Sequence, residues 1–248
     1  MANRQRAEAR RKAQAKASRS GGGGGAMGKL GIWVALAVVL VLGVGIAIFT
    51  SGDDSKASTP GAGSSDSPGG VSSLPDSQPV TVTGEPLVRL DEADSPDPSV
   101  GVVAPVLSGL NFNGEAITID PAKDGPYMVV FLAHWCPHCN VEVPRLNTWK
   151  HSGAVPTELK VIGVATAAST GGEFYPPSSW FSNRGWEWPV MVDETQGDGV
   201  AGKAAMAYGA PGWPYFVIVG ADGKVKARVS GRVEVADLQI LVDNALAA

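Results

Sequence analysis

The two cysteines of the 248-residue chain lie in the segment AHWCPHCNVEVP, separated only by a proline and a histidine. A disulfide between Cys136 and Cys139 would close a loop of four residues, and the loop-entropy description gives it only about 2 kcal/mol of stabilisation. A structural zinc site needs four ligands, whereas these cysteines and His138 supply three. Covalent haem attachment needs a histidine where Asn140 stands. The spacing therefore favours a redox-active dithiol.

The flanking residues indicate how this dithiol is positioned. The continuous apolar run YMVVFLA (127–133) predicts a strand buried on both faces, and a helix is expected from Pro137 to about Lys150. Cys136 then lies at a helix N-terminus, where free N–H groups and the helix dipole stabilise a thiolate. Pro137 suits the first turn because no N–H is needed there. We expect Cys136 to be the exposed nucleophile and Cys139 the more buried resolving thiol.

Three further polar side chains near the pair have open roles. His138, when protonated, can attract the Cys136 thiolate and lower the pKa of that thiol further; a solvated surface position is its alternative. Glu142 is a candidate for proton transfer, or else a surface residue that complements the helix dipole. His134 borders the segment without an assigned role.

Strands and helices alternate through the rest of the C-terminal part. Asp222-Gly223 is a strong tight-turn signal between the last two strands. This order predicts an α/β layered fold with a mixed central sheet. In addition to the two elements above, the expected strands are 115–119, 158–166, 214–219 and 225–230, and the expected helices are 178–184, 200–208 and 233–246, the last with an apolar stripe of Val235, Leu238, Leu241, Val242 and Leu246.

The N-terminal residues predict where this domain is located. Residues 1–29 carry eight basic residues against one acidic, and residues 30–49 are twenty residues without a charge. A helix of that length spans about 30 Å, the thickness of a bilayer core, and no clear signal-peptide cleavage site follows it. A retained transmembrane helix in contact with membrane lipid is therefore expected. Because the basic residues precede the span, the N-terminus should be cytoplasmic and the remainder extracytoplasmic.

Composition divides the remaining chain into two parts. Residues 50–98 are rich in Ser, Gly, Pro and Asp, which predicts a flexible linker. The runs PVTVTG and PLVRL within it are candidates for a strand or for packing on the domain. Residues 99–248 are one domain's worth of chain. After residue 29 the chain has twelve basic residues against twenty-three acidic ones, which argues against nucleic acid as a partner.

The cysteine segment resembles the active site of the thioredoxin superfamily, in particular its membrane-anchored TlpA-like (ResA/DsbE-like) branch. The similarity extends over about residues 100–248, including GLNFNGEAITI and the stretch from WEWPVMVDETQ to KARVSG. The branch shows the pattern W-C-x-x-C-x-x-E-x-P, which is matched here by Trp135, Cys136, Cys139, Glu142 and Pro144.

The resemblance implies a thioredoxin-like fold with an inserted strand–helix unit between the active-site helix and the second half. It also implies a cis-proline at Pro214, next to Trp213, with both residues and Trp135 contacting substrate. Two departures from the family pattern stand out: Trp213 replaces the usual Thr or Val, and Val130 occupies a position where many members bury an acid. Without that acid, proton transfer to or from the second cysteine must use water, Glu142 or another group.

The activity implied is thiol–disulfide exchange with protein substrates and a membrane or extracytoplasmic redox partner, without cofactor or metal. Members of this branch are mostly reductases, several serving cytochrome c maturation, which favours reduction slightly. An oxidising catalyst is an alternative, because the Pro-His dipeptide also occurs in DsbA-type enzymes. A Cu(I)-binding metallochaperone using His138 is another, although copper carriers of this fold usually show a longer cysteine spacing. A peroxidase would normally carry Thr where Ala133 stands.

Overall fold

The computed structural model describes residues 74–93 and 96–247. The predicted basic segment and membrane span (1–49) lie outside these residues. Among the residues described, no helix has the length and apolar character needed to cross a bilayer. The elements are β1 (Thr81–Thr83), β2 (Val106–Leu110), β3 (Ala116–Ile119), α2 (Pro121–Asp124), β4 (Tyr127–Leu132), α3 (Pro137–His151), β5 (Lys160–Ala165), α4 (Pro177–Asn183), β6 (Val190–Val192), α5 (Lys203–Ala207), β7 (Tyr215–Val219), β8 (Val225–Ser230) and α6 (Val235–Ala247).

The predicted α/β fold with a mixed sheet is confirmed. The strand order is β1-β2-β6-β5-β4-β7-β8, with β3 paired to β2. Strand β4 runs parallel to β5 and antiparallel to β7, so it is central. Because it has neighbours on both edges and helices or strands on both faces, all six of its residues are buried, which explains the continuous apolar run.

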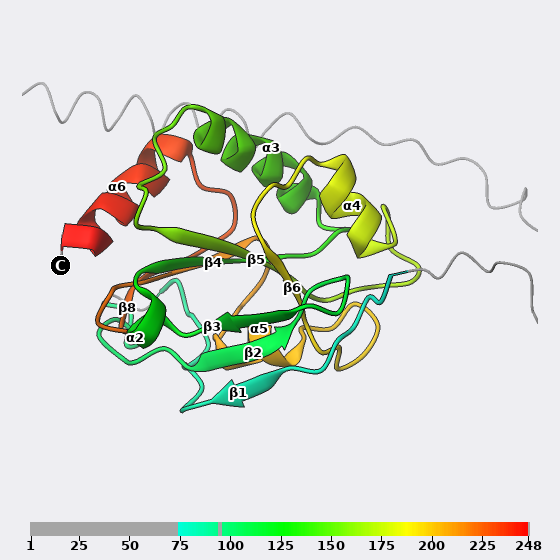
Figure 1. Ribbon diagram of the computed structural model, residues 1–248, viewed down its shortest axis with the longest axis horizontal. Coiled ribbons are helices and arrows are strands. Elements are labelled where there is room, and N and C mark those ends of the chain that lie inside the picture. Colours follow the sequence, from blue (N-terminus) through cyan, green and yellow to red (C-terminus); the bar gives the residue numbers. More distant parts are fainter. Residues whose placement is uncertain (1–73, 94–95, 248) are drawn as a thin grey trace, which may run out of the picture. The chain divides into compact units, whose positions relative to one another are not determined.

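Two apolar clusters hold the layers together, one on each face of the sheet. Alternate residues of β4 supply them: Met128, Val130 and Leu132 face α3 and α6, and Tyr127, Val129 and Phe131 face the cluster that contains α5 and β3. Figure 1 shows α3, α4 and α6 on one side of strands β4 and β5, and α5 on the other side, near β1, β2 and β3, which continue the same sheet. The predicted apolar stripe of α6 packs on the first cluster.

The elements expected from the sequence pattern are confirmed to within three residues at their ends, whereas the strands β2 and β6 and the four-residue helix α2 were not expected. Strand β2 contains a serine and a glycine, and β6 has three residues, so neither shows a clear period. Helix α4 and strand β6 lie between β5 and the second half of the domain, where the resemblance implies an inserted unit. Strand β6 pairs with β5 and with β2.

The domain begins before residue 99, so the prediction of a flexible linker over 50–98 is wrong for its described part. Strand β1 pairs with β2, and Val80, Leu87 and Leu90 are buried. The backbone N–H of Leu87 donates to Ala207 and that of Leu90 to Gly209, both at 2.9 Å. The alternative, that the two short apolar runs form a strand and pack on the domain, is confirmed. The few apolar residues of these runs are diluted in the composition of the segment, but Val80, Leu87 and Leu90 are buried in the fold, and only Val88 stays largely exposed.

Candidate active site

The two cysteines lie where β4 leads into α3, as the sequence predicts. Cys136 is the N-cap residue of α3, with an extended backbone (φ −74°, ψ 121°), and Pro137 occupies the first turn. The N–H of Cys136 donates to the Ala133 carbonyl at 3.1 Å, and the N–H of Asn140 donates to the Cys136 carbonyl at 3.1 Å. The turn therefore presents the first sulfur at the N-terminus of a fifteen-residue helix.

The two thiols are free and have opposite electrostatic environments. A hydrogen bond from the Cys139 thiol lowers the pKa of Cys136 to about 6, with help from the backbone N–H groups of Cys139 and His138 and against the effect of burial. Burial, followed by the interaction with Cys136, raises the pKa of Cys139 well above its usual value. At neutral pH the pair therefore holds one thiolate and one thiol.

Cys136 is less accessible than the sequence suggested. The residue is 6% exposed, compared with 0% for Cys139. The expectation of an exposed nucleophile is wrong in degree, because the segment before β7 packs against the sulfur. Cys136 Sγ lies 3.4 Å from the Trp213 carbonyl oxygen. Cys136 is nevertheless the more accessible of the two cysteines, as expected.

The Trp213–Pro214 peptide bond is cis, as the resemblance implies. The Trp213 side chain is half-buried and contacts both apolar clusters, and Pro214 is buried. Trp135, also half-buried, donates from Nε1 to the Ala167 carbonyl at 2.7 Å. The structure thus brings all three predicted substrate-contacting residues to the cysteine turn.

Asn140 ties the turn to α4, a role that sequence reasoning missed. Its Nδ2 donates to the carbonyls of Cys136 at 3.0 Å and His134 at 3.2 Å. Its Oδ1 accepts a hydrogen bond from Trp180 Nε1 at 2.8 Å. No pattern in the sequence marks this residue, because its partner Trp180 comes from a distant helix.

Glu142 is fully buried, so the prediction of a surface residue that only complements the helix dipole is wrong. It lies one turn after Cys139 on α3, and its side chain is 1% exposed. Neither carboxylate oxygen has a hydrogen-bond partner among the described residues, and Arg145 Nη1 lies 3.9 Å from Oε2. Burial raises the pKa of Glu142 to about 7, opposed by the nearby Val233 backbone amide and by Arg145. Val130, by contrast, is part of the apolar core.

The histidines differ in their surroundings. His138 is exposed, and its charge is the smallest of the causes that lower the pKa of Cys136. His151 is exposed at the end of α3 and contacts Glu187 at 3.1 Å. His134, to which the sequence assigned no role, is buried, and both of its ring nitrogens have backbone partners.

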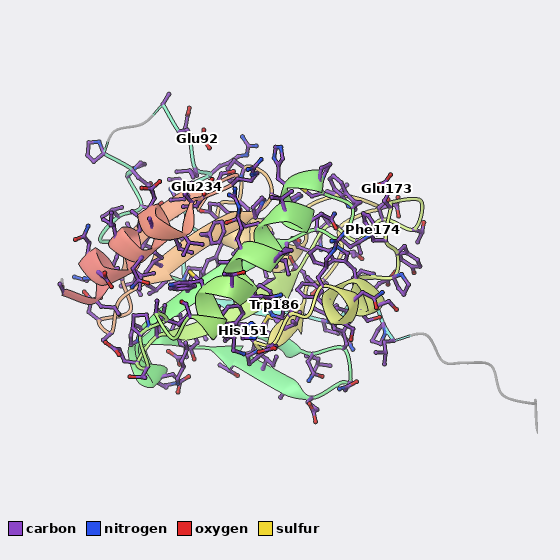
Figure 2. The ribbon with its side chains drawn as sticks, turned by 90° about the horizontal axis from the view of Figure 1, so that it is seen from above. Glu92, His151, Glu173, Phe174, Trp186 and Glu234 are labelled. Atoms are coloured by element: carbon purple, nitrogen blue, oxygen red, sulfur yellow. The ribbon has the colours of Figure 1, made fainter. Side chains whose placement is uncertain are left out.

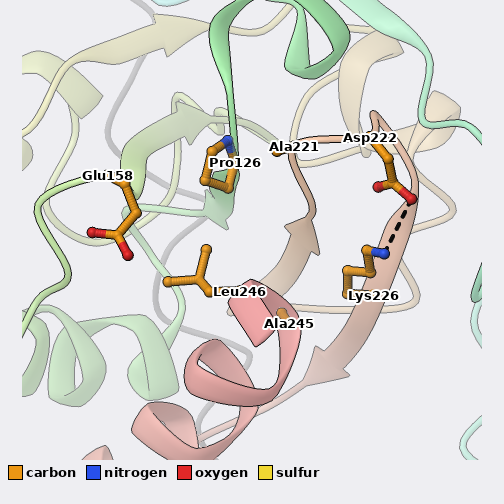
Figure 3. A pocket seen from close by; sticks show the side chains of 7 residues that line it. All are labelled: Pro126, Glu158, Ala221, Asp222, Lys226, Ala245 and Leu246. Carbon is orange, nitrogen blue, oxygen red and sulfur yellow. Dashed lines mark hydrogen bonds and ion pairs between the residues drawn. The ribbon is translucent and has the colours of Figure 1, made fainter. Parts of the chain in front are cut away.

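A pocket of about 400 Å³ lies away from the two cysteines and is lined by residues that include Pro126, Asp222 and Leu246 (Figure 3). Pro126 precedes β4, whereas the cysteines follow it, so the pocket lies at the opposite edge of the sheet. It contains the Asp222–Lys226 ion pair and no nucleophile. Among residues 74–93 and 96–247, no three His, Cys, Asp or Glu side chains are grouped to hold a metal ion.

The mixed sheet, the strand–turn–helix and the cysteine pair at the helix N-terminus define a thioredoxin-like protein. Residues 100–228 match the AhpC/TSA family, and the chain belongs to this family. The resemblance to the thioredoxin superfamily is thereby confirmed.

Similarities to individual proteins cover about half of the chain. The soluble secreted antigen MPT53 of Mycobacterium tuberculosis is 29% identical over 137 residues, 55% of this chain and 69% of that protein. StoA from Bacillus subtilis aligns with 18% identity over 58% of this chain and 98% of its own, with a TM-score of 0.44. A secreted M. tuberculosis disulfide oxidoreductase homologous to E. coli DsbE aligns with 23% identity over 55% and 93%, with a TM-score of 0.42.

Proposed function

We propose that this protein is a thiol–disulfide oxidoreductase that exchanges disulfides with protein substrates through Cys136 and Cys139. The observation that carries the proposal is the asymmetry of two thiols within one helical turn. The pKa of the first thiol is lowered to about 6, and the pKa of the second is raised. A nucleophile paired with a protonated, buried resolving thiol is what a two-step exchange requires.

The exchange proceeds through a mixed disulfide. The Cys136 thiolate attacks one sulfur of a substrate disulfide, and the other substrate sulfur leaves as a thiolate and takes up a proton. Cys139 then loses its proton and attacks the Cys136 sulfur, which releases the second substrate thiol and forms the Cys136–Cys139 disulfide. Two electrons pass from the pair to the substrate, and the reverse sequence oxidises a substrate dithiol.

Glu142 is the group placed to take the proton from Cys139. It is buried on the same face of α3, one turn away, and its pKa of about 7 lets it bind or release a proton near neutral pH. Its negative charge also raises the pKa of Cys139. The Glu142 carboxylate on α3 thus provides the buried acid that many members of the superfamily carry on the strand, at the position that Val130 occupies here.

Replacing Glu142 with glutamine is expected to slow substrate reduction at neutral pH and to stabilise the fold above it. The folded-state pKa of about 7 lies above the ordinary value of 4.5. The contribution to stability is therefore full below the ordinary pKa and is lost as the pH rises through the folded-state pKa. The variant should unfold at higher urea concentration than the wild type at about pH 8, and at a similar concentration at about pH 5.

The matched control for this test is Glu158→Gln, an exposed glutamate at the opposite edge of the sheet. It should leave both the rate and the urea midpoint unchanged. A Glu142→Gln protein that reduces substrate at the wild-type rate, with an unshifted midpoint at about pH 8, would contradict the proton-transfer role.

Reduction is the direction that we propose. Stabilising a thiolate stabilises the reduced protein and makes the cysteine pair more oxidising. The pKa of Cys136 is therefore one indicator of the direction of electron transfer. A pKa of about 6 is nearer to that of thioredoxin, about 7, than to that of DsbA, about 3.5. A measured potential near −270 mV supports a reductase, and one near −120 mV supports the oxidising alternative (both approximate). A role in cytochrome c maturation rests on the resemblance to the TlpA-like branch alone.

We further propose that the protein is a single-pass membrane protein with its N-terminus in the cytoplasm and the redox domain outside. The basic segment 1–29 and the uncharged span 30–49 support this topology. In intact, reduced cells, a membrane-impermeant maleimide is expected to label the full chain at Cys136. Labelling that occurs only after lysis, while the purified protein reacts readily, would overturn the orientation.

A further inference from the structure

His134 lies two residues before Cys136 and is not used by the proposed exchange. Its side chain is buried, with 1% of the residue exposed. Nδ1 lies 2.7 Å from the Glu173 carbonyl oxygen, and Nε2 lies 3.1 Å from the Ser169 backbone nitrogen. A carbonyl only accepts and a backbone N–H only donates, so the ring is neutral, with its proton on Nδ1. Both partners belong to the segment that follows β5.

This segment packs closely on the cysteine turn. A Cβ atom added at Gly172 would lie 2.9 Å from Trp135 Cβ and 3.2 Å from His134 Cε1, so only glycine fits without a shift. The segment continues into Phe174 and Tyr175, which are 49% and 43% exposed. The Tyr175 ring packs edge-on against His134, with 5.9 Å between ring centroids. His134 therefore joins the turn to an exposed aromatic surface.

The backbone at Phe174 shows that its surroundings hold this surface in place. Its φ of 61° lies in the left-handed region, which a phenylalanine rarely adopts. Glu173, the preceding residue, is bound by His134, and the Arg184 guanidinium lies 5.2 Å from the Phe174 ring centroid. Figure 2 shows Glu173 and Phe174 together at one end of the domain, apart from His151.

We propose that His134 is a positioning residue for the exchange reaction: it holds residues 169–175 as a wall beside Cys136, against which an extended substrate polypeptide places an apolar side chain. This inference rests on the proposed function. Two exposed aromatic rings, on the segment that packs against the cysteine turn, match an apolar residue that flanks the reacting cysteine of the substrate. His134 itself does not touch the reacting sulfur atoms.

The contact depends on pH because the Nε2 atom must stay unprotonated to accept the Ser169 N–H. The carboxylates facing the ring are Asp198, which binds Ser169 and Thr170, and Asp76, which binds the Tyr175 hydroxyl. Burial lowers the pKa of His134 despite these two charges. The wall is therefore intact at neutral pH, and acidification through the lowered pKa releases it.

The test compares two disulfide-linked peptides, one with Phe and one with Gly beside the reacting cysteine. In the wild-type full chain, the Phe peptide should have the lower KM. His134→Ala should raise the KM of the Phe peptide by up to about tenfold, the loss of one aromatic contact, with a smaller effect on the Gly peptide. His134→Asn keeps a donor and an acceptor, so it should restore part of the preference for the Phe peptide. In this variant the preference should no longer be lost at acid pH. His151→Ala is the matched control and should behave as wild type.

Each result decides the inference. If His134→Ala fails to fold, Phe174→Ser at the exposed tip must lower the preference for the Phe peptide. Equal preference in the wild type and in both variants would overturn the inference and leave the proposed function standing. A wild-type protein that reduces neither peptide would instead overturn the proposed function.

Discussion

Replacing Cys136 with serine is expected to abolish reduction of a disulfide substrate such as insulin by the full chain. Because its pKa is lowered to about 6, the Cys136 side chain is mainly a thiolate at pH 7. A serine hydroxyl in the same place stays protonated and cannot attack a disulfide. Insulin precipitation in the presence of dithiothreitol measures the loss. Full activity in the Cys136→Ser/Cys139→Ser double variant would contradict the proposed redox function.

The second cysteine should give a different result. Cys139→Ser keeps the attacking sulfur but removes the resolving one, so the mixed disulfide at Cys136 should accumulate. A slower-migrating band on a non-reducing gel, lost on addition of dithiothreitol, detects it. Because the Cys139 thiol is the main cause of the low pKa of Cys136, this variant should also raise that pKa. Trapping by Cys136→Ser instead would reverse the assignment of the two roles.

The second large effect concerns stability. Replacing Asp97 with asparagine should lower the free energy of unfolding by about 3 kcal/mol, because it leaves a buried charge on Arg228 without its partner. The Arg228 side chain is 0% exposed and binds both oxygens of Asp97 through Nε and Nη2. Its Nη1 donates to the Val88 carbonyl at 2.7 Å, so Arg228 holds both Val88 and Asp97 against β8. Urea unfolding at neutral pH measures the change.

The pH dependence gives this prediction a second readout. The hydrogen bond from Arg228 lowers the pKa of Asp97 below its ordinary value. The stabilisation is therefore present above the unfolded-state pKa of about 3.9 and is lost as the pH falls through the folded-state pKa. The difference between wild type and Asp97→Asn should shrink in that acid range.

The control is Asp222→Asn, in the turn between β7 and β8; the Asp222 side chain is 45% exposed and pairs with Lys226. Exposed pairs contribute about 0–1 kcal/mol, so little change is expected. Equal effects of the two substitutions would show that the Asp97–Arg228 pair does not stabilise the domain.

The local sequence contains enough information to predict the cysteine turn. An apolar run with turn signals predicts a buried strand, Pro137 predicts the start of a helix, and two cysteines one turn apart predict a dithiol at that junction. Each of these inferences depends on residues close together in the chain. The span at residues 30–49 is likewise read from its length and lack of charge, and it stays a prediction.

The tertiary structure decided the surroundings of the dithiol. Glu142 has the position of a helix-surface residue, and it is buried because the chain before α6 covers that side of α3, bringing the Val233 backbone beside it. Its pKa near neutrality follows from that burial and has no sequence signal. His134 likewise acquires its partners, Ser169 and Glu173, only when β5 aligns beside β4.

The limits of the domain were also decided at long range. Asp97 and Arg228 are 131 positions apart. Val80, Leu87 and Leu90 became part of the core because β2, the last residue of α5 and Gly209 offer backbone partners to their segment. Composition describes how a segment behaves alone, whereas burial depends on which distant surface it meets. For this protein, the residues that react are visible in the sequence, and the residues that tune and flank them became visible only once the strands were paired.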